Sequence, residues 1–156
     1  MKKIYFDLKK CLACRSCEIA CALVHSKTGD IYKALEEKER PQPRIKVRNS
    51  YGYPFALVCQ HCELAPCVTA CMSGAMAKDK KTGATTHDAD RCVGCWMCIM
   101  ACPLGGLTRN AKGQVILKCD LCLKKDIPAC VAACPTKALF LGDEDEFKKA
   151  ISKKRK

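Results

Sequence analysis

Sixteen cysteines in a chain of 156 residues restrict the possible fold more than any other feature of the sequence. They form four groups of four, and each group begins C-x-x-C and ends C-x-x-x-C. Groups one and three have the tight spacing C-x2-C-x2-C-x3-C, whereas groups two and four carry a longer middle loop. This alternation predicts a duplicated unit that contains two motifs. In chain order the groups are Cys11, Cys14, Cys17 and Cys21; Cys59, Cys62, Cys67 and Cys71; Cys92, Cys95, Cys98 and Cys102; and Cys119, Cys122, Cys130 and Cys134.

The spacing within each group indicates iron–sulfur clusters. C-x-x-C places two thiolates on a tight turn, and in groups one and three a third cysteine after two further residues reaches a third corner of a cubane. Structural zinc sites instead draw their C-x-x-C pairs from separated segments. In bacterial ferredoxins the fourth cysteine, often followed by proline, binds the other cluster of a pair, and residues 92–103 have this form. We expect the sixteen cysteines to be the iron ligands of four [4Fe–4S] clusters.

Disulfide bonds are a poor explanation of the even cysteine count. Residues 1–7 contain no apolar stretch long enough for a secretory signal. We therefore expect a cytoplasmic protein. Structural disulfides are rare in such a reducing compartment. The sequence has no charge-free apolar run of transmembrane length, so we expect no membrane span.

The formal net charge of +12 raises the question of nucleic-acid binding. An oxidised [4Fe–4S] cluster with its four thiolates carries a charge of roughly −2. Four such clusters lower the net charge to roughly +4, so much of the Lys and Arg excess is explained as counter-charge. We expect no nucleic-acid partner. A zinc-stapled interaction module with a basic tail stays as the alternative from another class of protein.

The segments between the cysteines predict short strands and helices, an α+β fold. In group one, Cys21 is followed by residues 22–25, which contain no Gly or Pro, so we expect a longer helix there than in the other groups. Residues 26–50 are charged and contain two prolines, so we expect a helical excursion followed by an extended linker. Residues 143–156 predict a solvated helix with a frayed end. Short β-favouring runs precede the four groups at residues 4–7, 55–58, 85–87 and 115–118.

Because the fourth cysteine serves the other cluster, the groups must work in pairs. Pairing of sequence neighbours, nested pairing and alternating pairing are all compatible with the spacing. The arrangement resembles the four-cluster electron-transfer subunits that serve molybdopterin and nickel oxidoreductases, in which group one pairs with group four and group two with group three. The resemblance implies one cluster held by Cys11, Cys14, Cys17 and Cys134, a second by Cys21, Cys119, Cys122 and Cys130, a third by Cys59, Cys62, Cys67 and Cys102, and a fourth by Cys71, Cys92, Cys95 and Cys98.

The same resemblance implies a duplicated dicluster ferredoxin fold, in which short strands and helices surround the four clusters. Two bacterial-ferredoxin-like lobes are expected. Lobe one comprises residues 1–24 with 111–142, and lobe two comprises residues 51–110. Residues 25–50 form the charged, Pro-containing linker excursion, and residues 143–156 form the charged C-terminal tail.

A closer resemblance extends over most of residues 2–142. Its elements are CLACRSCEIACALVHS at 11–26, PQPRI at 41–45, CQHCE at 59–63, CVGCWMC at 92–98 and CDLC at 119–122. Together they resemble the iron–sulfur subunit (CooF-type) that accompanies nickel carbon monoxide dehydrogenase. The resemblance implies electron transfer from that enzyme to a hydrogenase or a flavin NAD(P) oxidoreductase. The equivalent subunit of a formate dehydrogenase or hydrogenase complex is the alternative.

The sequence contains no recognisable catalytic constellation. It has no nucleophile–base pattern, no G-x-G-x-x-G fingerprint and no P-loop. With all sixteen cysteines needed to saturate the clusters, no open coordination position is left for a substrate. We therefore expect an electron-transfer subunit without a catalytic site of its own.

Several residues beside the cysteines are not expected to be ligands. His61, like His25 and His87, is expected at the surface or next to a ligand. Trp96 is expected to shield a cluster or to pack against the protein. Basic residues adjoining the ligands either tune the cluster potentials or are ordinary solvated cations, and both interpretations stay open for Arg15, Arg91 and Lys118.

Overall fold

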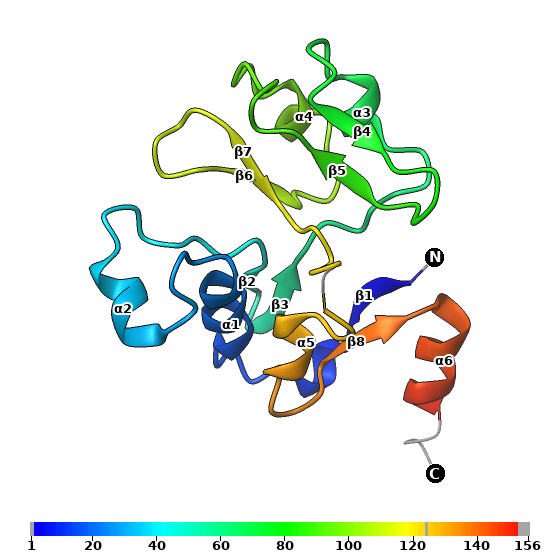
Figure 1. Cartoon of the computed structure of the whole chain (residues 1–156). Helices are drawn as coiled ribbons and strands as arrows, with labels where there is room; N and C mark the ends of the chain where they lie inside the picture. The colour runs from blue at the N-terminus through cyan, green and yellow to red at the C-terminus, as the bar shows by residue number, and fades with distance from the viewer. Residues whose placement is uncertain (1, 124, 153–156) are drawn as a thin grey trace.

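The computed structural model describes residues 2–123 and 125–152 of the chain. Buried apolar side chains gather in two clusters. The first, called the lower cluster, includes residues of α1 (Ser16–Val24) and α5 (Ala129–Ala132), which lie in the lower half of Figure 1. The second, called the upper cluster, includes residues of α3 (Pro66–Thr69) and α4 (Met97–Met100), which lie in the upper half. Ile4 and Leu139 belong to the lower cluster, whereas Met76, Leu107 and Ile116 belong to the upper one. Buried cysteines take part in both, so sulfur atoms fill space that larger side chains occupy in other proteins.

The strands pair two by two, always antiparallel. β1 (Lys3–Phe6) pairs with β8 (Leu139–Gly142), so the strand before group one joins the strand after group four. This pairing brings the two ends of the cysteine-containing region together. The other pairs are β2 (Lys46–Ser50) with β3 (Tyr53–Leu57), β4 (Met76–Lys78) with β5 (Thr85–His87), and β6 (Leu107–Arg109) with β7 (Ile116–Lys118).

The helices are short and mostly follow the cysteine loops. They are η1 (Leu8–Lys10), α1 (Ser16–Val24), α2 (Ile31–Glu36), α3 (Pro66–Thr69), α4 (Met97–Met100), α5 (Ala129–Ala132) and α6 (Glu144–Ser152). α1 packs against α5 and α3 packs against α4, so helices of groups one and four meet, as do helices of groups two and three. None of the helices within residues 2–123 and 125–152 has the length and hydrophobicity needed to cross a membrane.

Most local expectations from the sequence are confirmed. The four β-favouring runs overlap β1, β3, β5 and β7. The longer helix of group one is α1, with nine residues against four in each of α3, α4 and α5. The α+β class is therefore confirmed.

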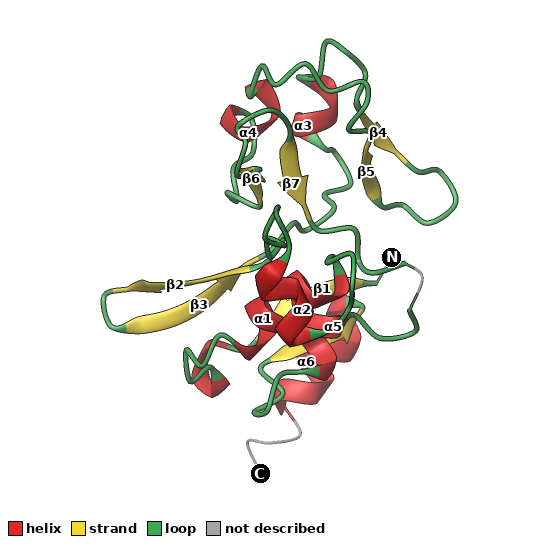
Figure 2. Ribbon diagram, turned by 60° about the vertical axis from the view of Figure 1, so that its left-hand side comes forward, coloured by secondary structure: helices red, strands yellow, loops and turns green. Residues whose placement is uncertain are grey.

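Residues 26–50 differ from a simple linker at their C-terminal end. α2 begins after Asp30, whose carboxylate accepts hydrogen bonds from two N–H groups of the first turn, each at 3.0 Å. The expected extended segment then ends in β2, which forms a hairpin with β3 through Tyr51 (φ 51°) and Gly52 (φ 83°). Figure 2 shows this hairpin reaching away from the rest of the chain. Val47, near its base, is buried in the lower cluster and anchors it.

The helix expected in the tail is confirmed over the residues that the structure describes. α6 carries acidic residues in its first turn, where they interact favourably with the helix dipole. It is attached to the sheet by Phe147, whose ring stacks on Tyr5 at a centroid distance of 4.9 Å. The expected frayed end, residues 153–156, lies outside the described residues.

Replacing Ile4 by alanine is expected to destabilise the protein by about 2–5 kcal/mol, as other buried Ile-to-Ala changes do. Ile4 is 1% exposed and extends from β1 into the lower cluster, so truncation of its side chain leaves a cavity. The measurement is the urea concentration at the midpoint of denaturation. Ile19→Ala, at a position that is 55% exposed, is the control and is expected to change stability by less than about 0.5 kcal/mol. Equal losses in the two variants contradict the placement of Ile4 in the core.

Candidate iron–sulfur sites

Four cysteines from opposite ends of the chain line one cavity. Cys11, Cys14 and Cys17 come from the loop before α1 and from its first turn, and Cys134 follows α5. The β1–β8 pairing and the packing of α1 on α5 bring these segments together. Much of the remaining lining is apolar and comes from Phe6, Leu12, Val47, Ala56, Ala138 and Leu139. The cavity therefore presents four thiols in largely apolar surroundings.

A second cavity is lined by Cys59, Cys62, Cys67 and Cys102. Here the packing of α3 on α4 brings groups two and three together. The chain after Cys102 approaches the loop of group two so closely that a Cβ on Gly106 would lie 2.8 Å from the Cα of Cys59. Glycine is therefore required at this position for the two groups to meet.

Cys21 lies with group four. The charges of Cys119, Cys21 and Cys122 act on the Cys130 thiol and, with burial as the larger cause, raise its pKa. Charges shift a pKa in this way only at short range. The Sγ atom of Cys21 also accepts a hydrogen bond from the backbone N–H of Arg44 at 3.2 Å.

Cys71 lies with group three in the same manner. Burial raises the pKa of Cys98, and the charges of Cys71 and Cys92 add to the effect. The Sγ atom of Cys71 accepts a hydrogen bond from the N–H of Met76 at 3.4 Å. Cys95 lies on the exposed loop between Cys92 and Cys98.

The four cysteine loops repeat one unusual backbone feature. The residue before the second cysteine has a positive φ in every group: 55° at Ala13, 47° at His61, 66° at Gly94 and 60° at Leu121. Residues other than glycine rarely adopt this backbone conformation, and it persists mainly where the surrounding structure requires it. Left-handed residues in such turns direct backbone N–H groups toward one side and create a site for negative charge. The loops are thus shaped to receive an anionic thiolate–metal centre.

Burial keeps the deepest thiols protonated until a metal binds. Burial raises the pKa of Cys17 and Cys67 to about 11 and that of Cys119 to about 12. Thiolates are therefore unfavourable in these sites without a metal to compensate them. Backbone N–H groups also point at sulfur, as where Ala138 donates to the Sγ of Cys134 at 3.2 Å. Sets of four soft sulfur donors with such hydrogen bonds fit an iron–sulfur cluster.

Asp120 connects group four to the segment that follows α2. Its carboxylate pairs with the guanidinium of Arg44 at 2.6 Å and with the Nε2 of His25 at 3.2 Å. The Nδ1 of His25 lies 2.6 Å from the carbonyl oxygen of Cys21, and the hydrogen bond to Asp120 is the main cause that raises the pKa of His25 to about 9. His25, Asp120 and Cys122 place ligand atoms within 4.8 Å of one another. The ion pairs of Asp120 with Arg44 and His25 join these segments as a clamp.

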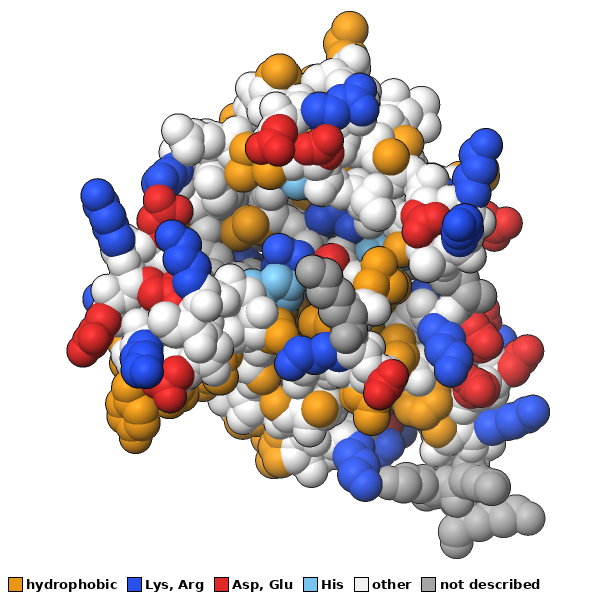
Figure 3. Space-filling view, in the orientation of Figure 1, with side chains coloured by type: hydrophobic (Ala, Val, Ile, Leu, Met, Phe, Trp, Pro, Cys, Tyr) orange, Lys and Arg blue, Asp and Glu red, His pale blue; other side chains and the backbone are white. Residues whose placement is uncertain are grey.

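Two of the three histidines, His25 and His61, lie beside cysteine residues. His61 is fully buried, and its Nδ1 accepts a hydrogen bond from the N–H of Thr85 at 3.1 Å. Burial lowers the pKa of His61 to about 3, so the ring is neutral. His87 lines a hollow between the two halves of the molecule, visible in Figure 3, together with Arg44 and Asp120.

The residues next to ligands have different surroundings. Arg15 and Arg91 are exposed, which favours the solvated-cation interpretation for both. Lys118 is buried, and this burial could not be inferred from its position before Cys119. Trp96 packs against the upper apolar cluster, as expected, with the guanidinium of Arg109 at 4.6 Å from its ring centroid. Nothing in the sequence indicates a role for Thr85. Its hydrogen bonds to His61 and Lys118 depend on the position of β5 opposite the loop of group two.

Comparison with known proteins supports the same chemistry. A family model described as a 4Fe-4S dicluster domain matches residues 51–144, which include groups two, three and four. The chain belongs to the 4Fe-4S dicluster domain family. The expectation of [4Fe–4S] clusters and a ferredoxin-like domain is therefore confirmed.

Relatives of this dicluster-domain protein match along nearly its whole length. The Electron transport protein HydN of Escherichia coli (strain K12) is 37% identical over 169 residues, covering 98% of this chain and 94% of the relative. An Iron-sulfur protein of Rhodospirillum rubrum is 36% identical, covering 97% of this chain and 87% of the relative. Protein NrfC of Escherichia coli (strain K12) is 36% identical, covering 94% and 67%.

A solved structure shares the fold of the dicluster-domain protein. It is the active site complex BamBC of benzoyl coenzyme A reductase with 1,5 dienoyl-CoA. One chain of this complex superimposes with a TM-score of 0.52 at 24% identity, covering 91% of this chain and 75% of that one. This likeness concerns the fold alone.

The Arg44–Asp120 pair is expected to couple the excursion to group four energetically. In a double-mutant cycle of Arg44→Met and Asp120→Asn, we expect a favourable coupling of about 0.5–1 kcal/mol, since both side chains are partly exposed. Denaturation midpoints of the two single variants and the double variant measure it. The more exposed Lys112–Glu39 pair serves as the control, through Lys112→Met and Glu39→Gln, and is expected to give no measurable coupling. Additive effects at Arg44 and Asp120 contradict the clamp.

Proposed function

We propose that this dicluster-domain protein transports electrons through four [4Fe–4S] clusters whose ligands are shared in a nested manner. Each cluster supplies a centre that accepts and releases one electron. Groups one and four share two clusters, and groups two and three share the other two. The proposed ligand sets are Cys11, Cys14, Cys17 and Cys134; Cys21, Cys119, Cys122 and Cys130; Cys59, Cys62, Cys67 and Cys102; and Cys71, Cys92, Cys95 and Cys98.

The observation that carries this proposal is the joint lining of each cavity by distant groups. Cys134 shares a cavity with three cysteines of group one, and Cys102 shares one with three cysteines of group two. The charges that link Cys21 to group four and Cys71 to group three favour the same pairing. Pairing of sequence neighbours requires Cys134 beside group three instead.

The proposal includes two bacterial-ferredoxin-like lobes. Lobe one, residues 1–24 with 111–142, is supported by the β1–β8 pair and the α1–α5 contact. Lobe two, residues 51–110, is supported by the β4–β5 pair and the α3–α4 contact. β7 pairs with β6 and so attaches the start of the 111–142 segment to lobe two. Residues 25–50 are the excursion between the lobes, and residues 143–156 are the tail.

Electron transport, rather than catalysis, is the role that these sites support. The name of the relative HydN, an electron transport protein, supports it. With four cysteines at each cluster, no iron keeps an open position for a substrate. The exposed cysteines are Cys14 and Cys95, which belong to different proposed sets. Because electron transfer falls steeply with distance, we propose that electrons enter and leave near these two residues.

The proposed donor is the catalytic subunit of nickel carbon monoxide dehydrogenase, and the proposed acceptor is a hydrogenase or a flavin NAD(P) oxidoreductase. These assignments rest on the resemblance in the residues around the cysteines, such as Arg15 to Ile19 and Trp96. A reducing cytoplasm is the proposed location. The same carrier serving a formate dehydrogenase or hydrogenase complex is the second candidate, and the match to the 4Fe-4S dicluster domain is compatible with both.

Cys11→Ser and Cys134→Ser are expected to disturb the same cluster, because both residues line one cavity. Electron paramagnetic resonance spectra of the reduced proteins measure the outcome. Cys102→Ser is the control and is expected to change a different signal, one that Cys62→Ser also changes. If Cys134→Ser and Cys92→Ser alter one common signal, groups three and four pair as neighbours and the nested proposal is wrong.

The anaerobically purified protein is expected to lose its broad visible absorbance when CO and a catalytic amount of carbon monoxide dehydrogenase are added. The reason is reduction of the clusters by electrons from CO oxidation. Formate with formate dehydrogenase, run in parallel, is expected to act more slowly. Bleaching by formate alone supports the second candidate. A colourless protein that contains zinc and no iron contradicts electron transport altogether.

A further inference from the structure

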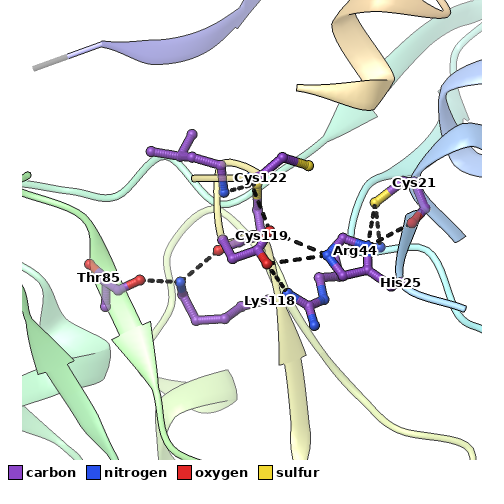
Figure 4. Close-up of polar contacts among 9 residues, drawn as sticks. Cys21, His25, Arg44, Thr85, Lys118, Cys119 and Cys122 are labelled. Carbon is purple, nitrogen blue, oxygen red and sulfur yellow. Dashed lines mark hydrogen bonds and ion pairs between the residues drawn. The ribbon is translucent and has the colours of Figure 1, made fainter. Parts of the chain in front are cut away.

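Three buried polar residues form one connected line between the two halves of the molecule. Among the described residues, those that are buried and polar or charged are His61, Thr85 and Lys118, with exposures of 0%, 2% and 5%. The Thr85 N–H donates to the Nδ1 of His61 at 3.1 Å, and the Thr85 carbonyl oxygen accepts a hydrogen bond from the Lys118 ammonium. That ammonium also donates to the carbonyl oxygen of Cys119 at 2.7 Å. Figure 4 shows Lys118 extending between Thr85 and Cys119.

The line runs from one cysteine set to another. His61 lies between Cys59 and Cys62, which line the second cavity. At the other end, Lys118 immediately precedes Cys119. Thr85, whose carbonyl oxygen accepts from Lys118, lines the second cavity together with Cys59 and Cys67. The ammonium group therefore lies between that cavity and Cys119, whose carbonyl oxygen it also contacts.

A buried ammonium group is costly unless nearby negative charge compensates it. The hydrogen-bond acceptors of Lys118 are neutral carbonyl oxygens. The carboxylate of Asp120 also acts on it, but that group is already paired with Arg44 and His25. Negatively charged clusters held by the cysteines on either side of Lys118 would supply the missing compensation.

We propose that Lys118 is a positioning residue that raises the reduction potentials of the two clusters on either side of it. This inference rests on the ligand sets of the proposed function. The two clusters are the one held by Cys59, Cys62, Cys67 and Cys102 and the one held by Cys21, Cys119, Cys122 and Cys130.

The physical reason is the charge of the reduced cluster. Accepting one electron makes a cluster with its thiolates about one unit more negative. A fixed positive charge nearby stabilises this reduced form, and the effect is stronger in the protein interior than in water. Lys118 therefore favours the reduced form of the two clusters whose ligand sets contain neither Cys14 nor Cys95, the proposed points of electron entry and exit. It also ties the two halves of the molecule together through Thr85, so the charge has a fixed distance to both clusters.

Arg91 provides a matched control within the chain. It immediately precedes Cys92, as Lys118 precedes Cys119, but its side chain is exposed. Its guanidinium reaches the carbonyl oxygen of Ser73 at 3.4 Å. Solvent and salt screen a charge in this position, so its removal is expected to have little influence on cluster potentials.

The test is a redox titration of the cluster-loaded protein, followed by electron paramagnetic resonance. Lys118→Gln removes the charge but keeps a hydrogen-bond donor. We expect it to make two clusters at least tenfold harder to reduce, which is about 59 mV for one electron. These are the clusters whose signals change in Cys59→Ser and Cys119→Ser. Arg91→Gln is expected to shift every potential by less than this, and Lys118→Arg, which retains the charge, is expected to stay near the unsubstituted protein.

Other outcomes overturn the inference. If Lys118→Gln lowers thermal stability but leaves the potentials unchanged, Lys118 is only structural. Equal shifts in all four clusters, or an equal shift in Arg91→Gln, also contradict a local charge effect. Lys118→Met is measured as well, so that the comparison survives if one variant does not retain its clusters. Iron and sulfide content of the unsubstituted protein tests the four-cluster proposal separately, since a low content contradicts that proposal and leaves the comparison of potentials readable.

Discussion

The crowding of buried thiols is the constraint on which the rest of this structure depends. Several cysteines lie so deep that burial opposes their ionisation, as for Cys17, Cys67 and Cys119. The surrounding protein has little stability of its own, because each sheet within the described residues has two strands and the buried apolar residues are divided between two small clusters. A metal centre removes the electrostatic cost and cross-links segments that are distant in sequence. Folding and cluster binding are therefore one coupled process.

Sequence predicted those parts of the structure in which a residue type has few alternative uses. The cysteine spacing indicated [4Fe–4S] binding, and β-branched runs such as residues 85–87 located strands. The pairing of groups could not be derived in this way, because it depends on contacts such as β1 with β8 that join the two ends of the chain. The positive φ values of Ala13, His61 and Leu121 were equally hidden, since none of these residues is a glycine. Left-handed backbone there is imposed by the loop and not by the side chain.

The basic residues show why adjacency in sequence is a poor guide to electrostatic influence. Arg91 and Lys118 both directly precede the first cysteine of a group, yet one is exposed and the other is enclosed. The difference arises because Lys118 ends a strand that enters the space between the two halves, where Thr85 offers a carbonyl oxygen. A formal net charge of +12 therefore combines cations that water screens with cations that act at close range.

The joining of β1 to β8 has a consequence for the order in which the protein matures. A chain that leaves the ribosome from its N-terminus presents Cys11, Cys14 and Cys17 long before Cys134 has been synthesised, so the cavity that all four line cannot yet exist. The cavity completed by Cys102 becomes available earlier. With the ligands shared in the proposed nested manner, the first three cysteines to be synthesised are the last to meet their fourth partner. The first site therefore depends on the last part of the cysteine-containing region.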